Sequence, residues 1–566
     1  MAASSRPASA SQEEFTPPGT FLLVKGTVFW LLAHDAFIPD SCKESEHDGI
    51  VSAERVVVLD PVPSADPNEP LNWSIKRKAV NLTLALTVTC LIFTALSVQV
   101  LFWQYMVVDM PVNYNQLNWA VSANNAGLAV GCMFFVPMAR KYGRRPTYLI
   151  STALMLATSF WSAEMKSVWE LYVTNVIQGL AGATNEAIVQ ITISDLFFVH
   201  QRGTMNGLYM TMMMTGSFLT PMAAGTQATN QSWRWSYRTM GIINAIVLLL
   251  FIFFYEETKY IPVIDGINTA PSNADTFDDR PRNDTKKATK DSTTELSGQP
   301  PAKFQPTTEQ RELDLSIPMN PLKKRFALFT PSPVPVWPFV YRPFIILLMF
   351  PAVLFTGMQY ACGVAWLTIM VSIQSMVYAY PPYNMSAEKI GFLGVAPFIG
   401  SLVGVVYGGY FGDRSILYYA RKNRGYYEPE MRLYNLHIPA LCQAGGLIMF
   451  GACTDRGLHW IWPTIGTGIF AFGLGSISDA ALTLVIDSYR EITGDAFTGI
   501  VFLRNAVSVG VPFGITPWME RDGLTNMFII CGFISLAVSC TYIPLAIYGK
   551  RVRTKLASRY YGMWVG

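Results

Sequence analysis

The chain has 566 residues, of which 51% are hydrophobic and only 14% are charged, and its mean hydropathy is +0.28. Soluble globular proteins carry about a quarter charged residues, so the composition excludes an ordinary soluble domain and favours a protein embedded in a lipid bilayer. The formal net charge of +3 is too small to suggest nucleic acid as a partner. The eight cysteines are scattered without CxxC or zinc-like spacing, so we expect no disulfide framework, metal site or cofactor.

Twelve segments are long and apolar enough to cross a bilayer, for which a helix needs about 20 residues. They fall into two sets of six, so we predict an all-α integral membrane protein built from two six-helix bundles, at 80–255 and 342–548. The expected spans lie near 80–104, 116–138, 146–164, 169–194, 203–227 and 236–255, and near 342–372, 388–411, 435–454, 459–485, 497–517 and 525–548.

Three polar segments flank and separate the two bundles. Residues 1–79 are expected to be a largely disordered cytosolic segment; its apolar stretch 21–33, interrupted by Lys25, is too short for a span and is expected to rest at the membrane surface. Residues 256–341 are rich in Asp, Lys, Thr and Pro, and we expect a disordered cytosolic linker because they bury too little apolar surface to offset their ordering entropy. Residues 549–566 are predicted to form a short basic cytosolic tail.

Lysine and arginine gather in alternate connections between the expected spans, and this bias predicts the orientation of the chain. One side of the membrane receives most of the basic residues, among them those around Arg140, whereas the connections on the other side carry about one each. We therefore expect a cell-membrane protein with both termini in the cytosol. The sequons at Asn230 and Asn384 then lie outside, where they are candidate glycosylation sites.

The connection between the second and third spans is a basic turn that reads ARKYGRRP. Positive charge that anchors a loop in the cytosol would explain it, but its spacing resembles the pattern G-x-x-x-D-R/K-x-G-R-R/K of major facilitator superfamily transporters. Gly143, Arg144 and Arg145 match the end of this pattern, whereas Val136 and Arg140 replace its Gly and Asp.

The corresponding turn of the second set restores the missing residues with Gly409, Asp413 and Arg414. Partial matches at equivalent turns indicate an internal repeat, and parallel six-helix halves are how this superfamily is built. The fourth span, with Gln178, resembles the superfamily's R-x-x-Q-G motif; Asn175 stands where the family has an Arg that it ties to proton coupling.

The fifth span is similar, at 216–225, to the G-x-x-x-G-P-x-x-G-G motif of proton-linked antiporters. Its Pro221 frees a backbone carbonyl and can bend the helix, although close packing through small residues explains the pattern equally well. DPNEPLNWSIKRK (66–78), YEETKY (255–260) and IDSYREITGDA (486–496) add to the likeness. Together these stretches resemble a fungal branch of the twelve-span drug:proton antiporter family, over residues 70 to 550.

That branch includes carriers of polyamines and related organic cations, as well as presumed exporters of secondary metabolites. The resemblance implies a lipid-embedded monomer that moves a small organic molecule, with protons as the coupling ion. We predict export of a secondary metabolite or toxic compound. Uptake of polyamines or related cations is the alternative, and a non-transporting nutrient sensor on the same fold is a further one.

Charged side chains inside the expected spans are candidates for coupling, because a charge at mid-bilayer costs roughly 3 kcal/mol on insertion scales. Glu186, near the middle of the fourth span, is a candidate proton or cation site, with Gln190 one turn further on the same face; a fixed structural hydrogen bond is the alternative. Asp479 lies at nearly the same position of the tenth span, allowing a slip of one residue. Arg504 in the eleventh span is a candidate partner for an acid.

Polar and aromatic side chains on the second and seventh spans are further candidates for substrate contacts, although packing between helices explains each of them: Asn124, Asn125, Gln359, Tyr360 and Trp366. In the basic turn, we expect Arg144 and Arg145 to bond helix C-terminal carbonyls and acids of facing helices and so to favour one conformation. The sequence lacks a G-x-x-x-x-G-K-[ST] phosphate cradle, which disfavours a nucleotide-driven pump, and the dispersed histidines disfavour an enzyme.

Overall fold

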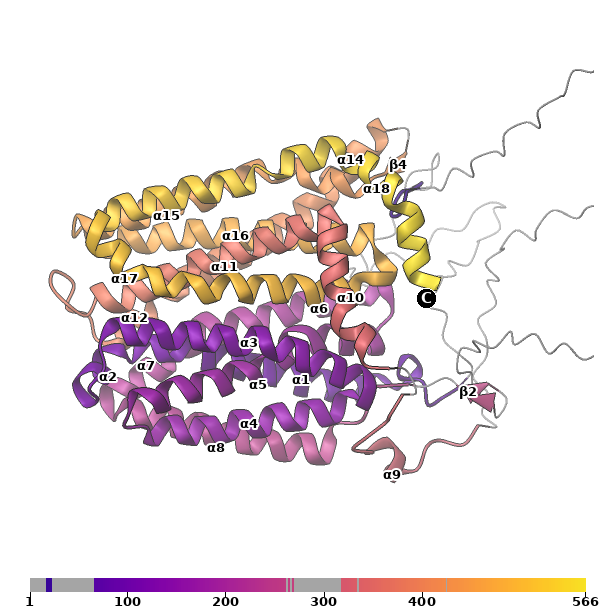
Figure 1. Cartoon of the computed structure of the whole chain (residues 1–566), viewed down its shortest axis with the longest axis horizontal. Helices are drawn as coiled ribbons and strands as arrows, with labels where there is room; N and C mark the ends of the chain where they lie inside the picture. Colours follow the sequence, from indigo (N-terminus) through magenta and orange to yellow (C-terminus); the bar gives the residue numbers. More distant parts are fainter. Residues whose placement is uncertain are drawn as a thin grey trace, which may run out of the picture.

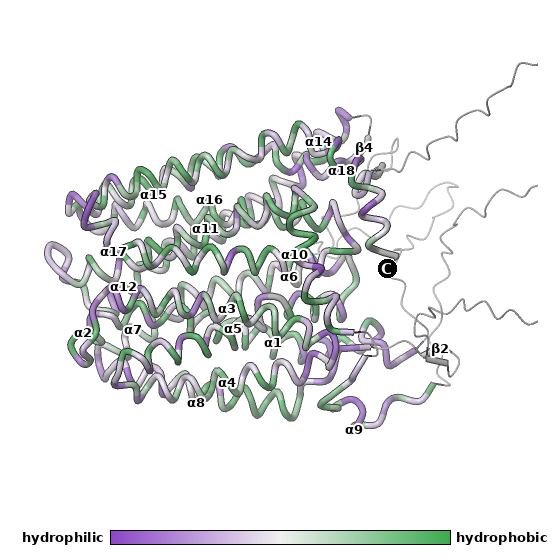
Figure 2. The backbone as a smooth tube through the Cα atoms, in the orientation of Figure 1, coloured by the Kyte–Doolittle hydropathy of each residue, from purple (hydrophilic) through white to green (hydrophobic). Residues whose placement is uncertain are grey.

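The computed structural model describes residues 17–22, 66–260, 263–264, 267–268, 317–332, 335–423 and 425–565. Most of the stretch 21–33 and the centre of the expected linker lie outside these residues. The described part is a bundle of long, roughly parallel helices (Figure 1). We call the end that carries the C-terminus the linker end, and the opposite end the distal end. Apolar residues dominate along the helices, and polar residues collect towards the ends (Figure 2).

The first half of the bundle contains the passes expected at 80–255, and α6, η2 and α7 follow one another to form a single pass around a π-helical turn. Its elements are α1 (Ile75–Leu101), α2 (Trp103–Asp109), α3 (Tyr114–Tyr142), α4 (Arg144–Glu164), α5 (Val168–Leu196), α6 (Val199–Met214), η2 (Thr215–Leu219), α7 (Thr220–Asn230) and α8 (Trp233–Phe254).

The second half also contains a π-helical turn, η3, and its α17 holds two passes because the backbone turns back at Gly523, where φ is 74° and ψ is 164°. Its elements are α10 (Trp337–Met349), α11 (Pro351–Val377), α12 (Ala387–Phe392), α13 (Val395–Val406), η3 (Tyr407–Phe411), α14 (Gly412–Lys422), η4 (Pro429–Asn435), α15 (His437–Asp455), α16 (Ile461–Ser488), η5 (Arg490–Ile492), α17 (Thr493–Ser539) and α18 (Tyr542–Val565).

Several short elements lie at the linker end: η1 (Pro70–Asn72), α9 (Leu322–Arg325), and the strands β1 (Phe21–Leu22), β2 (Val263–Ile264), β3 (Ile267–Asn268) and β4 (Tyr426–Tyr427). β1 pairs antiparallel with β4, and β2 with β3. The N-terminal residues 17–22 therefore dock on the second half of the bundle.

Seven helical stretches of the described chain are long and apolar enough to cross a membrane, or eight when the bent pair η4 and α15 counts as one span. One of them, Thr493–Met563, folds back at Gly523 and so holds two of the expected spans. α4, α5 and the α6–α7 pass are not in this set. α4 and α5 bury hydroxyl, amide and acidic side chains inside the bundle, which lowers their hydropathy without preventing them from packing there.

The structure differs from the sequence predictions at several boundaries. The span expected at 342–372 is two helices, because Pro351 lacks the N–H that would continue α10 and instead begins α11. The tail expected at 549–566 is a helix whose Arg553 is 2% exposed and donates hydrogen bonds to Glu430. Residues 317–332, at the edge of the expected linker, also pack against the bundle.

The two halves repeat the same glycine-mediated contacts between helices. A Cβ added at any of these glycines would overlap a backbone carbonyl of the neighbouring helix, so the helices approach as closely as their backbones allow. The equivalent pairs are Gly127–Val176, Gly131–Leu180, Gly400–Gly468 and Gly404–Phe472. A shift of 273 positions relates the glycines of the two halves, and a shift of 292 relates their partners. This agreement shows the internal repeat at the level of single contacts.

Candidate transport cavity

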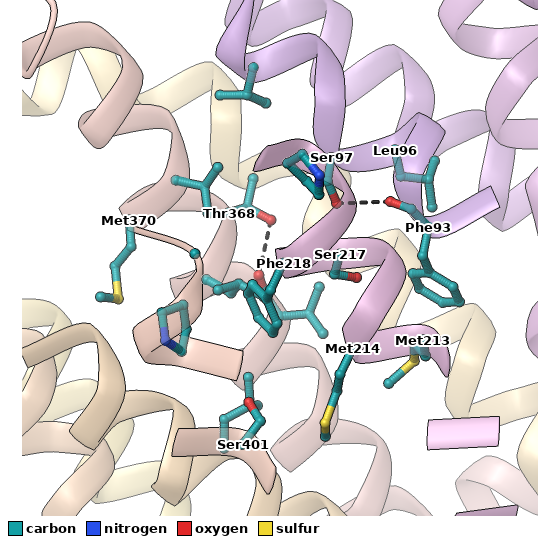
Figure 3. Close-up of a pocket in the computed structure, with 18 of the residues that line it drawn as sticks. Phe93, Leu96, Ser97, Met213, Met214, Ser217, Phe218, Thr368, Met370 and Ser401 are labelled. Carbon is teal, nitrogen blue, oxygen red and sulfur yellow. Dashed lines mark hydrogen bonds between the residues drawn. The ribbon is translucent and has the colours of Figure 1, made fainter. Parts of the chain in front are cut away.

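A cavity of about 280 Å³ lies between the two halves of the bundle. Its wall comes mainly from α1, α3, α5 and the α6–α7 pass of the first half and from α11, α13, α16 and α17 of the second. Figure 3 shows part of this wall, with thioether, aromatic and hydroxyl side chains of both halves facing one space, among them Phe93, Ser97, Met213, Met214, Phe218, Met370 and Ser401. A mainly apolar cavity with a few polar groups is typical of a small-molecule site.

An ion pair between the two halves forms one side of the cavity. Glu186 of α5 pairs with Arg504 of α17, and their side chains are 3% and 6% exposed. Asn505 completes the cluster, because its amide nitrogen donates to Glu186 Oε2 at 2.9 Å and its amide oxygen accepts from Arg504 Nη2 at 2.8 Å. The Arg504 guanidinium also lies 5.2 Å from the centre of the Tyr360 ring. The sequence suggested Glu186 and Arg504 as members of a site, but it gave no sign of Asn505.

Asp479 of α16 also lines the cavity, and Arg504 is not its partner. No residue in the described part of the chain makes a hydrogen bond or ion pair with its carboxylate. The shift of 292 positions that relates α5 to α16 carries Glu186 onto residue 478, so Asp479 lies one residue beyond the equivalent position. One residue of an α-helix turns the side chain by about 100°, so the two acids occupy different faces of equivalent helices.

The other expected contact residues divide into two groups. Asn124, Asn125 and Tyr360 line the cavity. Gln190 and Gln359 are not among the lining residues. The Gln359 amide instead donates to the Val538 carbonyl at 2.7 Å, which ties α11 to α17.

The halves also touch at both ends of the bundle. At the distal end the hydroxyls of Tyr114 and Tyr380 lie 3.0 Å apart, and Asn118 of α3 donates to Thr516 of α17 at 3.1 Å. At the linker end, Arg140 of α3 forms an ion pair with Asp495 at the start of α17. Arg140, which replaces the Asp of the superfamily pattern, thus reaches across to the other half.

Arg144 and Arg145 contact acids and carbonyls of the first half and its adjoining loop. Arg144 Nε lies 2.9 Å from Asp195 Oδ2 at the end of α5, and Arg145 Nη2 donates to the Ile252 carbonyl near the end of α8 at 2.7 Å. Glu257 accepts from the backbone N–H groups of both arginines at 2.9 and 3.1 Å, which satisfies free donors at the start of α4. Gly143 precedes this helix with φ of 118°, a backbone conformation that favours glycine.

The turn of the second half is built differently. Arg432 of η4 binds Asp487 at the end of α16 at 2.7 Å and Asp413 at 3.1 Å, all within the same half. The Asp413 side chain is 62% exposed, so this second contact is a surface ion pair. Arg414 lies over the ring of Tyr410, 4.6 Å from its centre.

Two ionisable residues after α8 have shifted pKa values. Burial alone would raise the pKa of Glu256, but hydrogen bonds from Arg325 and Arg77 outweigh it and lower that pKa. This contribution to stability is therefore present above the pKa of the unfolded chain and is lost as the pH falls through the lower folded value. Burial, with a smaller effect of Arg144, lowers the pKa of Lys259 to about 8.

The fifth pass meets the eighth where the antiporter-like motif lies. η2 interrupts the α-helical pattern just before Pro221, and π-helical turns are frequent at functional sites. A Cβ at Gly225 would lie 2.6 Å from the Ala387 carbonyl, and one at Gly391 would lie 3.1 Å from the Pro221 carbonyl. The small residues of this motif therefore serve close packing between the halves. Asn230 and Asn384 are both exposed.

The sequence profile of the Major Facilitator Superfamily matches residues 84–512. The chain belongs to this superfamily. It is an MFS-type transporter, and the predicted fold class, an all-α membrane protein with twelve helices in two repeats, is confirmed.

Similar proteins agree with this assignment. The uncharacterized MFS-type transporter C1271.10c of Schizosaccharomyces pombe is 29% identical over 563 residues, which cover 96% of this chain and 94% of that protein. The MFS antiporter QDR3 of Candida albicans is 24% identical over 79% of this chain and 74% of its own. The solved structure of the xylose transporter XylE from E. coli shares the fold, with a TM-score of 0.51, 12% identity and coverage of 82% of this chain and 98% of that one.

Proposed function

We propose that this transporter exports a small amphipathic organic molecule, a secondary metabolite or toxic compound, in exchange for protons. The observation that carries the proposal is the Glu186–Arg504 ion pair, which joins the two halves at the wall of the cavity. The similarity to a protein named as an antiporter supports the exchange mode.

The ion pair explains how a proton can control the two halves. Both charges are almost fully buried, so neither is stable there without the other. A proton on Glu186 removes the negative charge that holds Arg504 and so weakens this contact between the halves. Loss of that proton restores the pair, and the proton leaves on the side to which the cavity is then open. Because a bound proton changes the relative stability of two conformations, it can drive their exchange.

The linker end supplies a second set of contacts for this cycle. Arg140 and Asp495 hold α3 to α17 across the halves, while the contacts of Arg144 with Asp195 fix the first half itself. In the proposed orientation this end faces the cytosol with both termini, and the protein acts as a monomer in the plasma membrane. Asn230 and Asn384 are then external and open to glycosylation.

Uptake of polyamines or related organic cations is the second candidate function. It is favoured by Asp479, whose carboxylate faces the cavity without a partner among the described residues. When the cytosol is negative relative to the outside, the membrane potential pulls cations inward by about 2.3 kcal/mol per charge for each 100 mV. The same cavity would then carry its substrate into the cell.

Transport by purified protein in proteoliposomes tests the proposal. Vesicles loaded with ethidium or with labelled putrescine are placed in a pH gradient of either sign. Protease accessibility of the termini determines which way the protein is oriented in the vesicles. Proton-driven exchange predicts that an inward proton gradient accelerates probe movement towards the side opposite the linker end. Acceleration towards the linker end selects uptake instead.

Glu186→Gln should abolish the response to pH while exchange of probe between the two sides continues. Glu164→Gln is the matched control, because the Glu164 side chain is 64% exposed at a helix end. An unchanged pH response in Glu186→Gln would remove this residue from the mechanism.

A further inference from the structure

The cavity contains one acid that no residue in the described part of the chain neutralises. Among the described lining residues, only Glu186 and Asp479 are acidic and only Arg504 is basic. Glu186 and Arg504 neutralise each other, so the remaining charge is the carboxylate of Asp479. An ionised group removed from water is costly unless an opposite charge or hydrogen-bond donors compensate it.

No basic side chain in the described part of the chain compensates the Asp479 carboxylate. Arg432 influences Asp479 electrostatically, but its guanidinium is taken up by Asp487 at 2.7 Å and Asp413 at 3.1 Å. Arg504 is held by Glu186 and Asn505. The Asp479 carboxylate is thus left facing the cavity with its charge uncompensated.

The helix next to Asp479 brings its backbone close against the carboxylate. Gly408 lies in the π-helical turn η3, and a Cβ at this position would lie only 2.7 Å from Asp479 Oδ2. The equivalent residue of the first half, 273 positions earlier, is the fully buried Phe135. A side chain at position 408 would displace the Asp479 carboxylate, so this glycine is what lets the acid take its place.

The rest of the wall suits the apolar body of a ligand. Met214, Phe218 and Met370 face the cavity (Figure 3), and Tyr360 and Phe470 also line it. Thioethers adapt to irregular shapes, and aromatic faces attract cations. One anchoring carboxylate within such a wall matches a molecule with one positive charge and a bulky apolar part.

We propose that Asp479 is the substrate anchor and that the substrate is a monovalent, amphipathic organic cation. The Glu186–Arg504 pair is then reserved for coupling and does not bind the substrate charge. This inference rests on the proposed transport function for its meaning, but it makes a separate claim about binding.

Binding of labelled tetraphenylphosphonium to the purified protein tests the anchor. Asp479→Asn should weaken binding at least about tenfold, which corresponds to about 1.4 kcal/mol, while Asp479→Glu, which keeps the charge, should retain most of it. Gly408→Ala should also weaken binding, because it crowds the carboxylate without changing its charge. Asp522→Asn is the matched control, at a side chain that is 37% exposed near the turn at Gly523. Gel filtration and thermal unfolding show that each variant is folded.

The proposal is tested by comparing a cation with a neutral molecule of similar shape, and wild type with Asp479→Asn. Triphenylphosphine oxide, a neutral molecule of similar shape, should bind weakly and equally to wild type and Asp479→Asn; wild-type affinity for it equal to that for the cation excludes charge recognition. Unchanged tetraphenylphosphonium binding in Asp479→Asn also excludes the anchor. Binding that depends on Asp479, combined with no response of transport to pH, would confirm the anchor and reject the proton-exchange function.

Discussion

The two halves of the molecule share a backbone arrangement and differ in where their charges go. In both, an arginine at the linker end binds the acid that closes a long helix, Arg144 with Asp195 and Arg432 with Asp487. At the equivalent position of the turn, however, the first half has Arg140 and the second has Asp413. Asp413 pairs with the arginine of its own half. Arg140 pairs with Asp495 of the other half.

The acids in the cavity show the same division of roles. Glu186 and Asp479 lie on equivalent helices, but a slip of one residue turns them to different faces. Glu186 meets Arg504 from the other half, whereas Asp479 meets Gly408 within its own. The repeat therefore fixes the helix packing, and small changes in register and charge assign different tasks to the two halves.

The largest difference in stability should appear when the arginine is removed from the ion pair between the halves or from the ion pair within the second half. Arg504→Ala leaves Glu186 as an uncompensated buried charge, and we expect a loss of about 3–5 kcal/mol in the free energy of unfolding. Arg432→Ala should cost less, about 1.5–3 kcal/mol, because Asp487 keeps a hydrogen bond from Tyr427 at 2.5 Å. Titration of the detergent-solubilised protein with SDS measures both values.

The double variant Glu186→Ala with Arg504→Ala removes both buried charges and should recover part of the loss. If Arg504→Ala is no more harmful than Arg432→Ala, the pair between the halves is not the buried, mutually dependent contact that its geometry indicates.

Sequence reasoning recovered the parts of this arrangement that depend on local pattern. Span length and hydropathy gave the two six-helix halves, and the cost of charge in a bilayer pointed to Glu186 and Arg504. Which acid pairs with Arg504 depends on the rotation of two helices about their axes. A hydropathy pattern that tolerates a slip of one residue cannot determine that rotation.

The same limit explains the other differences. Gln359 and Tyr360 are neighbours in sequence, yet only Tyr360 lines the cavity, because one step along a helix moves the side chain to another face. The pair of Arg140 with Asp495 joins residues far apart in the chain, and no local motif marks Asp495 as its partner. Asn505 was missed because an amide next to a charged residue gives no distinct signal.

The glycine contacts test whether the two halves are as alike in packing as they look. Gly127→Ala and Gly400→Ala each place a methyl group against a backbone carbonyl, and we expect each to reduce the free energy of unfolding by about 1–3 kcal/mol. Gly445→Ala is the matched control, since no atom of a neighbouring element in the described part of the chain lies within 4 Å of the added Cβ. It should be neutral or stabilising by up to about 1 kcal/mol through helix propensity.

SDS titration of the three variants gives the comparison directly. Similar losses at Gly127 and Gly400 would show that α3–α5 and α13–α16 are equivalent energetically as well as geometrically. A loss at only one of them would mean that the repeat has relaxed in the other half.

Reversal of charges at the linker end has the smallest expected effect and tests the contact that distinguishes the two turns. Arg140→Asp places two acids together at the junction of α3 and α17, since Asp495 stays in place. The two side chains are 19% and 14% exposed, so we expect a shift of about 1–2 kcal/mol between conformations, or roughly 5–30-fold in their ratio. Transport rate in proteoliposomes and the distance between spin labels on α3 and α17 report this shift.

The swapped pair, Arg140→Asp with Asp495→Arg, should restore most of both readouts, because the two side chains attract each other again with their charges exchanged. Arg140 also lies 5.3 Å from the centre of the Phe339 ring, a contact that the swap does not restore, so recovery should be incomplete by about 0.5–1 kcal/mol. If the double variant behaves as the sum of the two single ones, the residues are not coupled. The first half would then lack the contact across the halves that sets its turn apart from the self-contained turn around Asp413.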